Sequence, residues 1–306
     1  MNKPTISIII RTLNEEKYLD QLLFGIKKQK AAPEHEIIVI DSGSTDNTLL
    51  IASKYNCKIL HITKEDYSFG KSLNQASDHA SGKYLVFISG HCIPKNDDWL
   101  KLLIDPLRNG SVDYSYGRQL GGADTYWSEK QILLKYFPDH DKIPQSGFYC
   151  NNANSAILRA KWEKFKFDEQ LTGLEDLALA KKLYLEGSNI GYVAQAEVYH
   201  LHHENWSQVK RRFEREALAL REICPEVIIK RRDAFRYFLI GIYQDIIANL
   251  PYSIALKRLL NSVCYRYHQF SGSYKGNHAS RLISQSLRES YFYPAASYKN
   301  PLTTKF

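Results

Sequence analysis

The chain has 306 residues, of which 44% are hydrophobic and 24% are charged, so it can bury a substantial core and is not an intrinsically disordered protein. Lys and Arg outnumber Asp and Glu by 41 to 33, and the net charge of +8 fits an anionic partner such as a nucleotide, a phospholipid surface or a nucleic acid, or else ordinary solvated surface charge. Only a short apolar run follows Met1, and the five cysteines show no metal-binding spacing, so we expect a cytoplasmic protein without a signal peptide or a transmembrane helix.

The N-terminal third repeats a pattern of apolar strand, polar loop and helix. Continuous apolar runs predict buried strands at residues 6–10, 37–40 and 83–89. Buried strands that alternate with helices are typical of a parallel sheet covered on both faces. Because the carboxyl ends of parallel strands share one edge of the sheet, the loops at Thr12, Asp41 and Ser89 are expected to form one site.

The later part of the chain is less regular. Its clearest predicted elements are a helix from about 175 to 187, a strand at 190–200 and a basic amphipathic helix at 206–223. A division after this helix separates a catalytic domain, 1–225, from a helical C-terminal region, 226–306. Residues 234–250 are apolar but include Arg236 and Asp245, which makes a bilayer span unfavourable; the segment is predicted either to lie in a membrane interface or to form a core helix of the C-terminal region.

Four stretches, in this order, resemble the family 2 inverting glycosyltransferases of the GT-A fold. They are "SIIIRTLNEEKYLDQLL", "EIIVIDSGSTDNT", "GKSLNQASDHASGKYLVFISGHCIPKNDDWL" and "FDEQLTGLEDLALAKKLYLEGSNIGYVAQAEVYH". Each stretch alone is a weak signal, whereas four in the right order are a strong one. The resemblance implies an α/β fold with a Rossmann-like, mostly parallel sheet flanked by helices, followed by a helical C-terminal extension.

The resemblance implies a nucleotide-sugar donor held by the first two loops, through Thr12, Asn14, Glu15, Asp41 and Ser42. Asp41 can accept hydrogen bonds from an imide N–H or a ribose hydroxyl group; its alternative role is to cap the helix that follows, and both roles can coexist. Lys71 begins a helix after Gly70, where a cation and backbone amides could face a diphosphate, although an ordinary exposed lysine is the alternative.

Glu175 and Asp176 stand where the family has its Glu-Asp pair. By that resemblance Asp176 is the base that deprotonates the acceptor hydroxyl group, and Glu175 binds or orients the acceptor. The alternative is structural, because acids in the first turn of a helix are favoured by the helix dipole.

The third stretch departs from the family pattern, because Ser89 and His91 replace the two acids of the Asp-x-Asp metal motif. Serine is a poor ligand for Mg²⁺, and imidazole favours softer ions such as Mn²⁺. Two interpretations follow. Either His91 and His200 hold Mn²⁺ or Mg²⁺ together with the donor phosphates, or catalysis is metal-independent and His91 with nearby cations offsets the charge of the leaving group.

The resemblance further implies a glycan or lipid-linked saccharide acceptor, as in the assembly of capsule or O-antigen, and contact with the inner face of the cytoplasmic membrane. A sugar nucleotidyltransferase and a non-catalytic nucleotide-sugar-binding protein are the alternatives. The loop "RTLNEEKYL" contains no glycine and has two adjacent acids, which counts against the nucleotidyltransferase. A nucleic-acid partner is not expected, since the basic residues form no dense stripe interleaved with aromatic residues.

Overall fold

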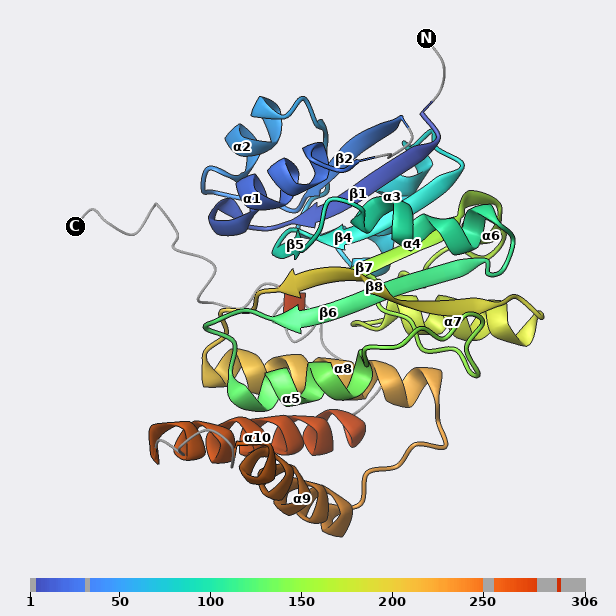
Figure 1. Ribbon diagram of the computed structural model, residues 1–306. Coiled ribbons are helices and arrows are strands. Elements are labelled where there is room, and N and C mark those ends of the chain that lie inside the picture. The colour runs from blue at the N-terminus through green and yellow to red at the C-terminus, as the bar shows by residue number, and fades with distance from the viewer. Residues whose placement is uncertain (1–3, 31–33, 250–255, 280–290, 293–306) are drawn as a thin grey trace. The chain divides into compact units, whose positions relative to one another are not determined.

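A computed structural model describes residues 4–30, 34–249, 256–279 and 291–292 (Figure 1). The chain divides into two compact units, 1–203 and 204–306. The division between the units therefore precedes the helix at 206–223, whereas the sequence suggested a division after it. This helix belongs with the C-terminal helices because it packs most extensively against the last of them. The assignment of the catalytic function to 1–225 stays a prediction.

A mixed sheet with the strand order β3-β2-β1-β4-β7-β6-β8-β5 forms the centre of the first unit (Figure 1). Its strands are β1 (Ile6–Thr12), β2 (His35–Asp41), β3 (Lys58–His61), β4 (Tyr84–Ser89), β5 (Cys92–Pro94), β6 (Tyr114–Gly121), β7 (Asn154–Leu158) and β8 (Ile190–His200). The first four strands pair in parallel. β7 is antiparallel to β4 and β6, and β5 is antiparallel to β8.

Helices cover both faces of this sheet. They are α1 (Glu16–Lys27), α2 (Thr48–Lys54), α3 (Phe69–Asp78), α4 (Trp99–Arg108), α5 (Trp127–Tyr136), α6 (Arg159–Phe165) and α7 (Glu175–Leu185). Ile8 of β1 packs in a core with Leu22 of α1, whereas the next residue, Ile9, packs in a second core with Leu73 of α3 and Leu179 of α7. Because successive side chains of a strand point to opposite faces, a continuous apolar strand is what a sheet buried on both sides requires.

The second unit contains α8 (Trp206–Ile223), α9 (Arg231–Asn249) and α10 (Leu256–Asn277). Two glycines of α10 let it approach α8 closely: a Cβ atom at Gly272 would lie 2.3 Å from the carbonyl oxygen of Lys210, and one at Gly276 would lie 1.9 Å from that of Glu214. Within the described ranges, no helix combines the length and the apolar character that a membrane span needs.

Candidate active site

The predicted donor loops meet at one edge of the sheet. Thr12 at the end of β1 pairs in register with Asp41 at the end of β2, and Arg11 pairs with Ser89 at the end of β4. The structure thus brings together the three loops that the sequence placed at one site.

Asp41 organises the loop after β2. Its side chain is buried, with Oδ2 accepting hydrogen bonds from the backbone N–H groups of Gly43 and Ser44, both at 2.9 Å. Oδ1 accepts from the hydroxyl groups of Thr12 (2.9 Å) and Ser44 (2.5 Å). The neighbouring Ser42 hydroxyl group donates to the carbonyl oxygen of Thr12 at 3.2 Å. Asp41 therefore fixes this loop to the end of β1, and its contact with a nucleotide stays a prediction.

The loop after β1 directs Glu15 toward His91. Asn14 has a left-handed backbone with φ 56°, and its Oδ1 accepts a hydrogen bond from the backbone N–H of Thr45 at 2.8 Å. Glu15 Oε1 accepts a hydrogen bond from His91 Nδ1 at 2.7 Å. A side chain at Gly90 would obstruct this contact, because its Cβ atom would lie 2.8 Å from Glu15 Cγ. The Ser-Gly-His sequence thus leaves room for a carboxylate beside the histidine.

Three histidines gather where β5 pairs with β8. Cys92 lies opposite His200 in the antiparallel register, and the backbone N–H of Leu201 donates to the carbonyl oxygen of His91 at 3.1 Å. The ring centroids of His91 and His200 are 5.1 Å apart, and those of His200 and His202 are 4.1 Å apart. One ring nitrogen of each histidine lies within 4.8 Å of the other two. We name these three residues the histidine cluster.

The Nδ1 atom of each ring in the histidine cluster is hydrogen bonded to another side chain. The pairs are His91 with Glu15 Oε1 (2.7 Å), His200 with Gln119 Oε1 (2.7 Å) and His202 with Glu129 Oε1 (2.8 Å). Since an ionised carboxylate and an amide oxygen can only accept, the proton of each neutral ring is on Nδ1. Nε2 is then the nitrogen that would coordinate a cation, in the arrangement typical of histidine ligands oriented by an outer carboxylate.

This set of donors fits a divalent transition metal. Neutral imidazole nitrogens suit Fe²⁺ and Zn²⁺, whereas Mg²⁺ and, less strongly, Mn²⁺ prefer oxygen ligands. The carboxylates of Glu15 and Glu129 orient two of these rings, because each accepts a hydrogen bond from the Nδ1 atom of a histidine. Ser89 and His91 thus replace the two acids of the Asp-x-Asp motif, and the same loop contributes an imidazole to a candidate metal site.

The Glu-Asp pair lies at the N-terminus of α7 with both side chains buried. Arg11 Nη1 donates to Glu175 Oε1 at 3.1 Å, and its guanidinium group packs over the ring of Phe69. Asp176 Oδ2 accepts a hydrogen bond from the backbone N–H of Asn152 at 2.7 Å. Arg11 therefore connects the pair to the strand that ends at the donor loops.

The environment of Asp176 suits a proton acceptor. Burial, followed by the negative charge of Glu175, raises the pKa of Asp176 to about 7, and the hydrogen bonds from the backbone and the charge of Arg11 offset only part of this effect. A carboxyl group with this pKa exchanges a proton near neutral pH, as a general base must.

Other predicted residues have different surroundings. Lys71 Nζ forms an ion pair with Asp66 Oδ1 at 2.6 Å, and its backbone N–H donates to Ser68, the N-cap of α3. His203 stacks on Tyr18 and is not among the histidines whose ring nitrogens converge. The role of Lys71 at a diphosphate stays a prediction.

The sequence assigned no role to some residues of the site. His202 alternates with His200, so a metal pair was geometrically possible, but a solvated side chain was the preferred interpretation. In the structure His202 is half-buried and hydrogen bonded to Glu129. Gln119 and Arg11 gave no such signal, because their partners are far away in the chain: Arg11 and Glu175 are 164 residues apart.

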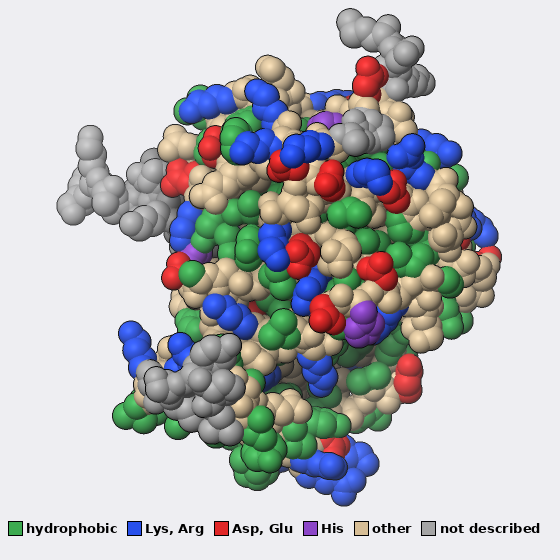
Figure 2. All heavy atoms as spheres, in the orientation of Figure 1, with side chains coloured by type: hydrophobic (Ala, Val, Ile, Leu, Met, Phe, Trp, Pro, Cys, Tyr) green, Lys and Arg blue, Asp and Glu red, His purple; other side chains and the backbone are tan. Residues whose placement is uncertain are grey.

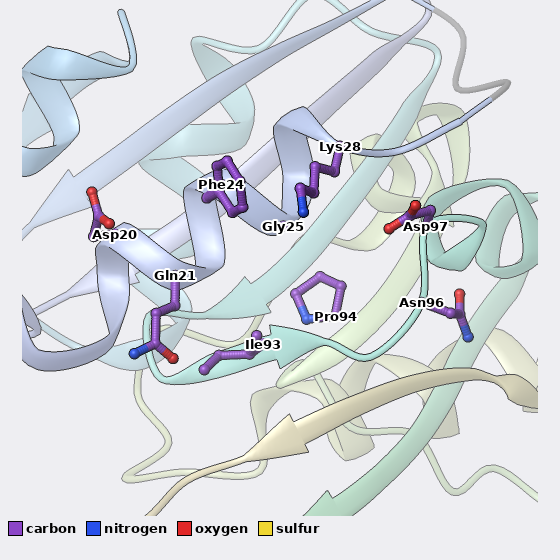
Figure 3. Close-up of a pocket in the computed structure, with 9 residues that line it drawn as sticks. All are labelled: Asp20, Gln21, Phe24, Gly25, Lys28, Ile93, Pro94, Asn96 and Asp97. Atoms are coloured by element: carbon purple, nitrogen blue, oxygen red, sulfur yellow. The ribbon is translucent and has the colours of Figure 1, made fainter.

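Figure 3 shows a separate hollow between α1 and the segment that contains β5. Phe24 and Lys28 line it from α1, and Pro94 and Asp97 line it from the other side. None of the residues predicted to bind the donor or a metal lines this hollow, so we do not assign the reaction to it.

Comparison with known protein families gives a match to the model described as glycosyl transferase family 2, over residues 7–165. The O-antigen chain rhamnosyltransferase RfbN of Salmonella typhimurium is 29% identical over 210 residues, which cover 64% of this chain and 66% of RfbN. The poly(ribitol-phosphate) beta-N-acetylglucosaminyltransferase TarS of Staphylococcus aureus is 24% identical over 216 residues, which cover 63% of this chain but 35% of TarS.

Solved structures share the fold. The mannosyltransferase PcManGT of Pyrobaculum calidifontis, solved with GDP-Man and Mn²⁺, has a TM-score of 0.61 at 15% identity and covers 90% of this chain and 88% of its own. The structure of S. aureus TarS residues 1–349 has a TM-score of 0.54 at 19% identity, covering 94% and 91% of the two chains. The predicted GT-A fold class is confirmed.

Proposed function

Because the chain belongs to glycosyl transferase family 2, it is a glycosyltransferase, and we propose that it transfers a sugar with inversion from a nucleotide-sugar donor to a hydroxyl group of a glycan or lipid-linked acceptor. The similarity to the O-antigen rhamnosyltransferase and to TarS supports a place in the synthesis of a bacterial surface polysaccharide.

The observation that carries this proposal is the buried Glu-Asp pair held by Arg11. Asp176 accepts the proton of the acceptor hydroxyl group as its oxygen bonds to the anomeric carbon, and the bond from that carbon to the diphosphate breaks with its electron pair on the departing nucleotide. Glu175, fixed by Arg11, orients the acceptor. Attack opposite the leaving group inverts the anomeric centre.

The departing diphosphate carries negative charge that the site must offset. His91, His200 and His202 would hold a divalent cation, which would supply positive charge to offset that of the departing diphosphate. The predicted nucleotide contacts Thr12, Asn14 and Asp41 lie on the adjoining loops and position the donor. Without a cation, a protonated His91 beside Glu15 would be the group that faces the phosphates.

The proposed acceptor is a glycan or a lipid-linked saccharide. A lipid-linked saccharide would be presented at the inner face of the cytoplasmic membrane, and the net charge of +8 suits an anionic surface there. We therefore propose a peripheral contact with that membrane.

Calorimetric titration with UDP, GDP, TDP and CMP tests the function. Each nucleotide is added in EDTA, in Mg²⁺ and in Mn²⁺, to the wild type and to His91→Ala and His202→Ala. His140→Ala is the control, because this histidine is exposed and lies outside the cluster. We expect one nucleotide to bind more tightly with Mn²⁺ and both cluster variants to lose that gain.

The other outcomes separate the interpretations. Equal binding in EDTA and Mn²⁺ would favour charge stabilisation by the protein alone. Binding without transfer to any acceptor would favour a non-catalytic donor-binding protein. Failure to bind any of the nucleotides under all conditions would contradict the proposed donor.

A further inference from the structure

The side of α9 that faces the rest of the second unit has small and polar residues at its centre, flanked by the half-buried Phe238 and Ile242. Ala234, Gly241 and Asp245 are its buried positions. Arg266 of α10 forms a buried ion pair with Asp245, through Nε to Oδ2 at 2.9 Å and Nη2 to Oδ1 at 2.5 Å. A Cβ atom at Gly241 would lie 3.0 Å from Arg266 Cδ, so the glycine makes room for this arginine. This ion pair and the stacking of Tyr237 on Phe270 join α9 to α10.

The opposite side of α9 is apolar. Phe235, Leu239, Tyr243 and Ile247 follow one another at intervals of four residues and are between 46% and 64% exposed. We name these four residues the outward stripe. A surface helix of a soluble protein normally turns its apolar face to the core, and a contiguous exposed apolar face indicates a binding surface. Helix α9 instead exposes apolar side chains, and the outward stripe lies on the side opposite Ala234, Gly241 and Asp245.

Positive charge accompanies the outward stripe. Lys230, Arg231, Arg232 and Arg236 are exposed, whereas residues 230–248 contain only two acids. These two acids are Asp233 and Asp245. Asp233 Oδ1 lies 3.8 Å from Arg232 Nε, and Asp245 forms the buried ion pair with Arg266. Figure 2 shows Lys and Arg side chains beside hydrophobic ones over α9.

We propose that the outward stripe docks the protein on a bilayer rich in anionic lipid, with α9 lying in the plane of the interface. Aromatic and aliphatic side chains enter the headgroup region, and the four cations pair with lipid phosphates. A second copy of the chain fits this face less well, because a symmetric contact would bring two sets of four cations together with only the partly exposed Asp233 of each copy to offset them. The proposal extends the proposed function, since a lipid-linked acceptor resides at such a surface.

Vesicle flotation of the full chain tests the proposal. Vesicles of phosphatidylcholine are compared with vesicles that contain about 30 mol% phosphatidylglycerol. We expect binding to the anionic vesicles alone. The double variant Leu239→Glu with Tyr243→Glu is expected to weaken binding at least about tenfold, and Arg232→Gln with Arg236→Gln roughly 30-fold. Leu50→Glu, at an exposed leucine of α2 in the first unit, is the matched control and is expected to bind as the wild type does.

Three results would overturn the proposal: no flotation with either vesicle, flotation unchanged by both double variants, or a wild-type dimer in sedimentation that Leu239→Glu with Tyr243→Glu converts to a monomer. The last result would assign the face to a second copy. Circular dichroism and thermal unfolding confirm that each variant is folded. Nucleotide binding by calorimetry separates the two proposals, because it is expected to persist in all of these variants even if none of them reaches the membrane.

Discussion

Asp176 is buried beside another acid and accepts hydrogen bonds from the backbone N–H groups of Asn152 and Leu177, and its behaviour can be tested directly. We expect Asp176→Asn to lower kcat by about 10²- to 10⁴-fold, the range for loss of a general base. The amide oxygen can accept from the backbone N–H of Asn152 or of Leu177 but not of both, so some loss of stability is expected and thermal unfolding must confirm that the variant is folded. Steady-state kinetics measures the loss. Glu186→Gln, at an exposed carboxylate at the end of the same helix, is the control, and wild-type rates in Asp176→Asn would remove this residue from the mechanism.

The raised pKa of Asp176 also predicts a pH dependence. The base must be ionised, so kcat/KM should reach half of its plateau near pH 7 and fall about tenfold per unit below it. The folded protein holds this proton more tightly than the unfolded chain, whose aspartate has a pKa of about 3.9. The free energy of unfolding should therefore decrease as the pH rises from about 4 to 7, and Asp176→Asn should remove that contribution. A flat kcat/KM between pH 5 and 8 would contradict the assignment.

Glu15 has two candidate roles that one measurement distinguishes. If it orients His91, Glu15→Ala should weaken Mn²⁺ binding about 10- to 100-fold in the absence of any nucleotide. Glu15→Gln should have a smaller effect, since its amide oxygen can still accept from Nδ1. Electron paramagnetic resonance of Mn²⁺ gives the affinity. Unchanged Mn²⁺ affinity with weaker nucleotide binding would instead make Glu15 a donor contact alone.

At the scale of elements, the contact between α8 and α10 depends on glycine. Gly276→Ala would place a Cβ atom 1.9 Å from the carbonyl oxygen of Glu214, so the two helices must separate. We expect a loss of about 1–3 kcal/mol in the free energy of unfolding, measured with denaturant. Gly25→Ala in α1 is the matched control, because its nearest neighbour, Pro94 Cδ, would be 3.4 Å away and helix propensity favours alanine. Equal losses in both variants would argue against the close approach.

At the scale of the whole molecule, every residue assigned to the reaction lies in the first unit. A nucleotide that binds only the folded state should stabilise it by about 2.7 kcal/mol when present at 100 times its dissociation constant. Thermal unfolding should therefore shift upward with the nucleotide and Mn²⁺, and EDTA should remove the metal-dependent part. If Mn²⁺ raised the unfolding temperature of His202→Ala as much as that of the wild type, the histidine cluster would not be the source of the metal-dependent stabilisation.

The sequence by itself predicted β1, β2, β4 and β8 and the loops that follow the first three of them, but neither β5 nor β6. Hydrophobic periodicity and loop chemistry are local, so the ends of β1, β2 and β4 could be predicted to share one edge of a parallel sheet. The family resemblance indicated the Glu-Asp pair and the Ser-Gly-His departure, and local composition indicated the apolar segment at 234–250.

Only the tertiary structure decided which distant side chains meet. The pairing of β5 with β8 brings His91 to His200 and His202, and it also makes His202 part of the site rather than a solvated residue. Arg11 reaches Glu175 across 164 residues, a contact that no local pattern encodes. The orientation of α9 was equally hidden, because an apolar helix can face a core or solvent, and the buried ion pair of Asp245 with Arg266 sets which side faces out.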